Sequence, residues 1–226
     1  MTGNTVGAEY AYRDNRGWQC RGCARQGLGT RGSCGDLWGA RSIRGEASSD
    51  GGGRGGAIVA SVLQAVQGAD AIVLAVPFDA VGDALAAAGD LSGRLLIDVT
   101  NPLRMGAAGL ELSLGFDRSA AEHVASLAPR ATVFKTLNQV GFEVMANTVG
   151  YAAPPVMFVA GDDDARKPVV MTLVSDLGFH AVDAGGLRVA RLLEPYGMLW
   201  IHMALDRKAG LDNAFAYLAR GGGLAG

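Results

Sequence analysis

The stretch AIVLAVPFDAVGDALAAAGDLSGRLLIDVTNP, residues 71–102, decides the fold. It starts with a continuous apolar run, 71–76, which Pro77 ends, and a second such run follows at 94–99. Short apolar runs bounded by turn residues are typical of strands buried on both faces, as in parallel sheets. Residues 79–89, between the runs, have the spacing of an amphipathic helix. The stretch therefore predicts a strand–helix–strand unit.

The same alternation extends from residue 58 to residue 205. It predicts a doubly wound α/β fold, with a parallel sheet and helices on both faces. The Gly-rich segment 103–118 is predicted to be a loop, and the usual first strand, Gly-rich turn and first helix are missing after residue 58. Further helices are predicted over 61–69, 119–128, 138–147, 162–178 and 187–205, and further strands over 131–137, 155–161 and 179–185.

The composition excludes several classes of protein. The 226 residues carry a formal net charge of −2, which gives no general reason to expect nucleic acid or an anionic membrane as a partner. No uninterrupted apolar run reaches the length of a membrane span, and the N-terminus lacks the apolar core of a signal peptide. We therefore expect a cytoplasmic protein whose three cysteines stay reduced.

The first quarter of the chain differs from the rest. Residues 1–57 hold 15 of the 34 glycines and carry a net charge of +3, whereas residues 58–226 carry −5. All three cysteines lie in CRGCARQGLGTRGSC, residues 20–34, which has too few ligands for a structural zinc and no preceding strand for a redox pair. We predict an atypical Gly/Arg/Cys-rich segment at 1–57, an α/β domain at 58–208 and a flexible tail at 209–226.

Two predicted strand ends carry residues suited to a ligand. In open parallel sheets, ligands bind at the carboxyl ends of the strands. AVPFDA (75–80) and DVTNP (98–102) place a proline and small or polar groups there, where a flat cofactor could lie against the backbone. The structural alternative for each motif is that proline simply ends a strand.

From residue 58 to residue 208 the chain resembles a known family. The motifs that carry the resemblance are IVLAVPFDAV, LIDVTNPL, SAAEHVASL, VFKTLNQVGFEVM, FVAGDDDARK, LGFHAVDAGGL and ARLLEPYGMLWIHMAL, in this order. Their order and spacing resemble those of the NADP oxidoreductases that depend on coenzyme F-420. The resemblance implies a Rossmann-type sheet that binds NADP(H), and a hydride that passes between nicotinamide and the deazaflavin ring of F-420 as co-substrate.

The resemblance also implies which residues form the site. Hydride transfer between stacked rings needs proximity and orientation more than an acid or base, so no strong catalytic residue is expected. Lys135 is a weak catalytic candidate, with a structural role as the alternative, and no metal site is expected. Cofactor-binding positions by motif match are Val76, Pro77, Phe78, Thr100, Asn101 and Pro102, with Asn138 and Gln139 beside the second ring and Arg41 near the 2′-phosphate.

The genetic code offers an account of the atypical segment. When residues 14–36 are written as degenerate codons and regrouped one nucleotide later, they permit I-I-G-A-G-N-V-G-A-A-L-A-K-A-L-A-x-A-G-H-V-x-I. This string is a strand, a G-x-G-x-x-G turn, a helix and a second strand. The hypothesis is that residues from about 13 to about 57 are translated out of frame, which the nucleotide sequence tests. Losing the turn would cost about 4–6 kcal/mol, or roughly a thousand-fold in NADP affinity.

The sequence thus predicts an NADP-dependent oxidoreductase, impaired by its N-terminal segment. Its expected partner is a small-molecule redox acceptor, and a homodimer is an option. One alternative is a catalytically silent interaction subunit with the same fold. Another is a reductase like those acting on β-hydroxyacids or imines, which would need a helical substrate domain that residues 206–226 are too short to supply.

Overall fold

The computed structural model describes residues 10–14, 17–21, 61–67, 69–107 and 109–220. Most of the atypical segment, with Cys23, Cys34 and Arg41, therefore lies outside the described residues. Two short strands are described within it, β1 (Tyr10–Asp14) and β2 (Gly17–Arg21). They pair with each other as an antiparallel hairpin, and β1 contacts the first strand of the central sheet.

The central sheet has five strands in the order β3-β4-β7-β8-β9. The first three are parallel, and their register aligns Leu74, Asp98 and Lys135 at the carboxyl ends. The α/β prediction is therefore confirmed, and all three strands have the predicted positions. The bounds are β3 (Ala71–Leu74), β4 (Leu95–Asp98), β7 (Thr132–Lys135), β8 (Val156–Gly161) and β9 (His180–Gly185).

The sheet differs from a fully parallel one at β8. This strand runs antiparallel to β7 and parallel to β9. The connection from β7 to β8 holds one helix, α4 (Phe142–Ala146), of five residues. Such a helix rises only about 7.5 Å, which is too short to carry the chain back to the amino end of β7. The chain therefore re-enters the sheet from the carboxyl end of β7, and β8 runs antiparallel to it.

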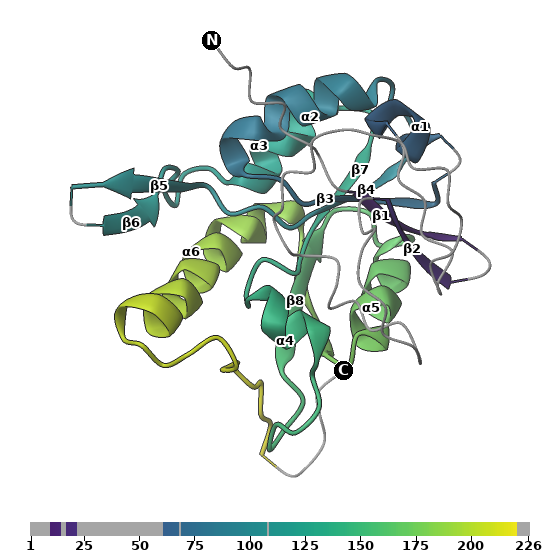
Figure 1. The fold of residues 1–226 in the computed structure, drawn as a ribbon. Coiled ribbons are helices and arrows are strands. Elements are labelled where there is room, and N and C mark those ends of the chain that lie inside the picture. The colour runs from purple at the N-terminus through teal and green to yellow at the C-terminus, as the bar shows by residue number, and fades with distance from the viewer. Residues whose placement is uncertain (1–9, 15–16, 22–60, 68, 108, 221–226) are drawn as a thin grey trace, which may run out of the picture.

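Helices cover both faces of the sheet (Figure 1). Neighbouring strand residues alternate between the two hydrophobic clusters: Ile72 and Leu96 face one, Val73 and Ile97 the other. The first cluster includes residues of α1 (Val62–Val66), α2 (Val81–Ala88) and α3 (Ala120–Leu127), and the second includes residues of α4 and α5 (Lys167–Asp176). The long helix α6 (Ala190–Ile201) contributes Ala190 to the first cluster and Trp200 to the second.

Short helical turns extend several of these helices. The 3-10 helix η2 (Phe78–Ala80) leads into α2, η3 (Leu187–Val189) leads into α6, and the π-helix η4 (His202–Asp206) follows α6. Two predicted starts are confirmed by side-chain caps, since Ser61 and Ser119 accept hydrogen bonds from the backbone N–H groups of Gln64 and Glu122. None of the helices that the structure describes is long and apolar enough to cross a membrane.

One prediction of irregular structure is corrected. Within 103–118, β5 (Leu103–Gly106) and β6 (Gly109–Leu112) form an antiparallel hairpin rather than a loop, and Figure 1 shows it projecting from the domain. The predicted flexible tail includes residues 209–220, which make hydrogen bonds to the rest of the domain. The Val156 N–H donates to the Phe215 carbonyl at 2.9 Å, and the Trp200 indole N–H donates to the Asn213 carbonyl at 2.7 Å.

Candidate functional site

The carboxyl ends of β3, β4 and β7 meet at one edge of the sheet and bring the predicted positions together. A reciprocal pair of hydrogen bonds joins two of these ends. The Asn101 side-chain amide donates to the Asn138 carbonyl oxygen at 2.8 Å, and the Asn138 amide donates to Asn101 Oδ1 at 3.0 Å. The turns after β4 and β7 are therefore held in fixed relative positions.

The predicted positions differ in exposure. Pro77 is exposed and Phe78 and Asn101 are half-buried, so these three offer surface to a ligand. Val76, Thr100 and Pro102 are buried behind them. The hydroxyl oxygens of Thr100 and Thr136 are buried without a hydrogen-bond partner in the part of the chain that the structure describes.

Gln139 has a different position from the one expected of a residue beside a ring. It has no exposed surface, and its side-chain amide donates to the Phe158 carbonyl and accepts from the Phe158 N–H, both at 2.9 Å. These two bonds imitate backbone pairing and tie the turn after β7 to β8. Gln139 therefore fixes the position of the turn after β7 and offers no surface to a ligand.

Lys135 lies at the centre of a buried group of charges. Its side chain has no exposed surface, and its Nζ is 2.9 Å from Asp98 Oδ2 and 3.2 Å from Glu194 Oε1. Nζ also donates to the Thr100 carbonyl oxygen. A residue enclosed in this way cannot touch a substrate, so the structural alternative for Lys135 fits the geometry, and its contact with Thr100 positions the turn after β4.

Glu194 connects these charges to helix α3. Its carboxylate accepts hydrogen bonds from the backbone N–H groups of Ala120 at 2.9 Å and Ala121 at 3.2 Å, at the positive end of the helix. Burial raises the pKa of Glu194, while Lys135 and the two N–H groups act in the opposite direction. Sequence reasoning missed Glu194, although a single acid in the apolar stretch ARLLEPYGMLW is a recognisable signal.

Close backbone approach brings α6 against the strand ends. A Cβ atom on Gly197 would lie 2.6 Å from the Asn138 carbonyl oxygen and 3.1 Å from Asn101 Oδ1, so only glycine fits there. On the other side, Leu137 has a φ of 59°, a left-handed conformation that is rare outside glycine. Such strain persists only where packing enforces it, and here it directs Asn138 toward Asn101.

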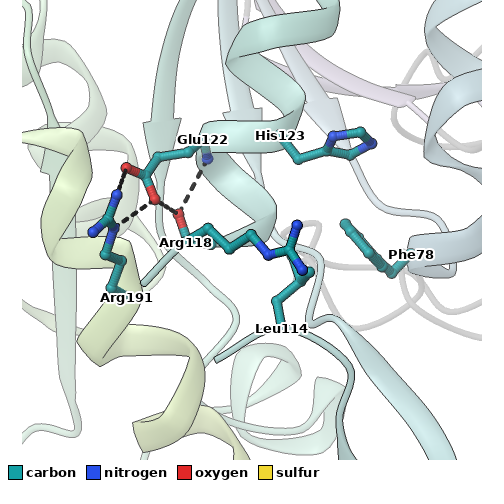
Figure 2. A pocket seen from close by; sticks show the side chains of 7 residues that line it. Phe78, Leu114, Arg118, Glu122, His123 and Arg191 are labelled. Carbon is teal, nitrogen blue, oxygen red and sulfur yellow. Dashed lines mark hydrogen bonds and ion pairs between the residues drawn. The ribbon is translucent and has the colours of Figure 1, made fainter. Parts of the chain in front are cut away.

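A pocket of about 480 Å³ lies beside this edge, and Figure 2 shows its lining. Its walls come from the turn after β3, the segment after β6, and helices α3 and α6. Among the predicted positions it contains Phe78, whose ring packs edge-on against His123 with centroids 5.8 Å apart. The lining residues are Phe78, Leu114, Arg118, Ser119, Glu122, His123 and Arg191.

NADP is the cofactor that this arrangement would accommodate, and the described residues fit its nicotinamide end. Thr100 offers a buried hydroxyl with unused hydrogen-bonding capacity, and Pro77 and Asn101 are accessible beside it. Arg41, predicted for the 2′-phosphate, lies outside the described residues. The Gly-rich turn that would hold the pyrophosphate is the part that the frameshift hypothesis removes from this chain.

Several known proteins are similar to this chain in sequence or in fold. Residues 40–102 match the family model for NADP oxidoreductase, coenzyme F420-dependent. The fold is similar to the crystal structure of a proposed F420-dependent NADP-reductase from Arthrobacter sp. FB24, with a TM-score of 0.67, 28% identity, and coverage of 72% of this chain and 76% of that one. It is also similar to the hypothetical protein SMa0349 from Sinorhizobium meliloti, with a TM-score of 0.52, 30% identity, and coverage of 58% and 63%.

A further relative is a much longer protein. Over 131 residues the chain is 29% identical to the metalloreductase STEAP3 of Rattus norvegicus, which is 58% of this chain and 25% of that protein. The chain thus spans about a quarter of the length of this curated relative.

The fold is Rossmann-type, and the family model and the Arthrobacter structure relate the chain to the class of NADP-dependent oxidoreductases. Within that class, the sequence similarity is to the coenzyme F420-dependent NADP oxidoreductases, whose family model matches 63 of the 226 residues. The family match starts at Ala40 and so includes residues 40–57, which the codon argument placed in the atypical segment. Arg41 lies within the matched residues, while the domain boundary at residue 57 stays a prediction.

Proposed function

We propose that this chain binds NADP(H) and transfers a hydride between its nicotinamide and the ring of a deazaflavin, coenzyme F-420, or a similar acceptor. One observation of the structure supports the proposal beyond the resemblance to the family. The reciprocal Asn101–Asn138 pair fixes two strand-end turns at the edge of the sheet, beside exposed Pro77. A rigid and partly open edge of this kind suits a reaction that depends on the placement of two rings.

The chain's own residues act by positioning in this proposal. NADP(H), when bound, supplies or accepts the hydride. Thr100 and Asn101 would face its nicotinamide end, with Pro77 and Phe78 along the channel. The buried Lys135 ammonium group donates a hydrogen bond to the Thr100 carbonyl oxygen. This bond fixes the conformation of the turn after β4. Asn138 then orients Asn101 through the two hydrogen bonds described above.

The test is a titration followed by an assay. NADPH fluorescence is titrated with the full chain, and NADPH oxidation is then followed with a deazaflavin, a flavin or a ferric salt as acceptor. We expect binding at high cofactor concentration and the fastest oxidation with the deazaflavin. A dissociation constant of about 1 mM corresponds to a binding free energy of about −4 kcal/mol. If no NADPH binds at about this concentration, the proposal is wrong for this chain.

A second candidate is a silent interaction subunit that keeps the fold without the chemistry. It is favoured by one observation, that the family match begins at Ala40 and leaves the expected Gly-rich turn outside it. A chain that is folded by circular dichroism but binds neither NADPH nor NADP would support this candidate.

A further inference from the structure

The pocket beside the strand ends has the size and position of a second ligand site. Its volume of about 480 Å³ lies within the range of about 300–1,000 Å³ that is typical of small-molecule sites. Phe78 forms one wall and directly follows Pro77, so the pocket continues the channel proposed for the cofactor. The opposite wall, from Leu114 to Ser119, follows the β5–β6 hairpin, which begins directly after Pro102.

The charges of the pocket do not cancel. Glu122 is neutralised within the protein, since Arg191 donates to both of its carboxylate oxygens at 2.8 and 2.7 Å. These bonds to Arg191 hold the pKa of Glu122 below its ordinary value of 4.5. The Arg118 guanidinium, in contrast, makes no hydrogen bond or ion pair with any residue that the structure describes. Figure 2 shows its side chain extending across the pocket toward Phe78 and His123.

The start of helix α3 does not supply an anion site of its own. The N–H groups of Ala120 and Ala121 already donate to Glu194, and the N–H of Glu122 donates to the Ser119 hydroxyl. Recognition of a negative charge in this pocket therefore depends on Arg118. The apolar contact surface comes from Phe78 and Leu114, with the His123 ring beside Phe78.

We propose that this pocket binds a planar aromatic molecule that carries an anionic group, with its ring against Phe78 and its charge on Arg118. The ligand's role as the hydride acceptor rests on the proposed function, but its binding does not. A guanidinium offers a planar set of donors that matches phosphate and carboxylate groups, and an aromatic wall suits a flat ring. The acceptor would thus be selected by its negative charge as well as by its ring.

The test compares two flavins that differ by one phosphate. Binding of FMN and of riboflavin to the full chain is measured by quenching of flavin fluorescence, without NADPH. We expect FMN to bind about ten-fold more tightly than riboflavin. Arg118→Gln should remove this difference, Arg118→Lys should restore part of it, and Phe78→Ala should weaken both ligands.

The matched control is Arg130→Gln. Arg130 is an exposed arginine near the other end of α3, where it pairs with Asp90 at 3.0 Å, so the variant changes the net charge equally and should keep the preference for FMN. Equal binding of the two flavins to the unmodified chain would overturn the proposal, as would an Arg118→Gln variant that keeps the difference. NADPH binding is titrated separately. If NADPH binds but FMN is not preferred over riboflavin, the proposed ligand site is wrong and the proposed function stands. If FMN is preferred through Arg118 but NADPH does not bind, the proposed oxidoreductase function is wrong and the ligand site stands.

Discussion

Among single residues, Lys135 has the largest predicted effect on stability. Replacing it with methionine keeps most of its volume but leaves the buried carboxylates of Asp98 and Glu194 without their cation. Breaking a buried ion pair from one side costs about 3–5 kcal/mol, so we expect Lys135→Met to lower the free energy of unfolding by that amount. Urea denaturation at neutral pH measures it.

Lys208→Met is the control for this variant, because it removes the same charge from an exposed residue. It should change the free energy of unfolding by less than about 0.5 kcal/mol. The loss in Lys135→Met should also shrink at acidic pH, because protonation of Glu194 removes one of the stranded charges. Equal losses in the two variants would show that the buried charges do not support the fold.

Glu122 makes the stability of the chain depend on pH in a defined direction. Its hydrogen bonds from Arg191 lower its folded pKa below the ordinary 4.5. Such a carboxyl stabilises the fold above its unfolded pKa and loses that contribution as the pH falls through the folded pKa. We expect Glu122→Gln to lose less stability than the unmodified chain between about pH 6 and about pH 3 in urea denaturation. Parallel losses would rule out this contribution.

The sequence could indicate which residues form the site but not how deeply each is buried. Lys135 lies within the strand predicted over 131–137, and both of its roles were compatible with that pattern. Its enclosure depends on Asp98 and Glu194, which are 37 and 59 positions away and come from β4 and α6. Likewise, the partner of Gln139 is the backbone of β8. Contacts between distant elements of this kind have no local sequence signal.

Among the elements, α6 offers a sharp test because of its close approach to the strand ends. In Gly197→Ala the new Cβ would lie 2.6 Å from the Asn138 carbonyl oxygen, so the helix must move. We expect the free energy of unfolding to fall by about 1–3 kcal/mol. We also expect weaker NADPH binding, because the Asn101–Asn138 pair is displaced. Thermal unfolding and NADPH fluorescence check the two effects.

Gly82→Ala in α2 is the matched control for this helix. A Cβ on Gly82 meets no atom within 4 Å among the described residues, so alanine should stabilise the helix by up to about 1 kcal/mol. A Gly197→Ala variant that is as stable as Gly82→Ala would mean that α6 does not pack tightly on the strand ends.

The elements that were predicted correctly have strong local signals. Buried apolar runs predicted β3, β4 and β7, and the helices predicted over 61–69 and 119–128 include α1 and α3. The β5–β6 hairpin was missed because its strands have no buried apolar run, since their residues are exposed or half-buried and include glycines. The direction of β8 was missed because it depends on the short length of α4, which the pattern over 138–147 overestimated.

At the scale of the whole molecule, the sheet has an unusual edge. β3 ends the order of the five-stranded sheet in the described residues, yet all four of its residues are buried. This burial pattern is typical of strands in the interior of a parallel sheet. Such strands are covered on both faces and have a neighbouring strand on each side. In this structure the strand β1 contacts β3. Under the frameshift hypothesis, the first strand of the shifted frame would pair with β3 instead.

Restoring that frame is the test of the whole domain. Replacing residues 14–36 with the string from the shifted frame, with alanine at its two undefined positions, should supply a strand beside β3 and a Gly-rich turn at its end. The turn's N–H groups would hold the cofactor's pyrophosphate. We expect NADPH to bind roughly a thousand-fold more tightly, equivalent to about 4–6 kcal/mol, and the domain to unfold at a higher temperature.

A restored chain with the three turn glycines changed to alanine is the control, and it should keep most of the added stability but little of the added affinity. If the restored chain binds NADPH no better than the original, the Gly-rich turn does not account for the weak binding expected of this chain.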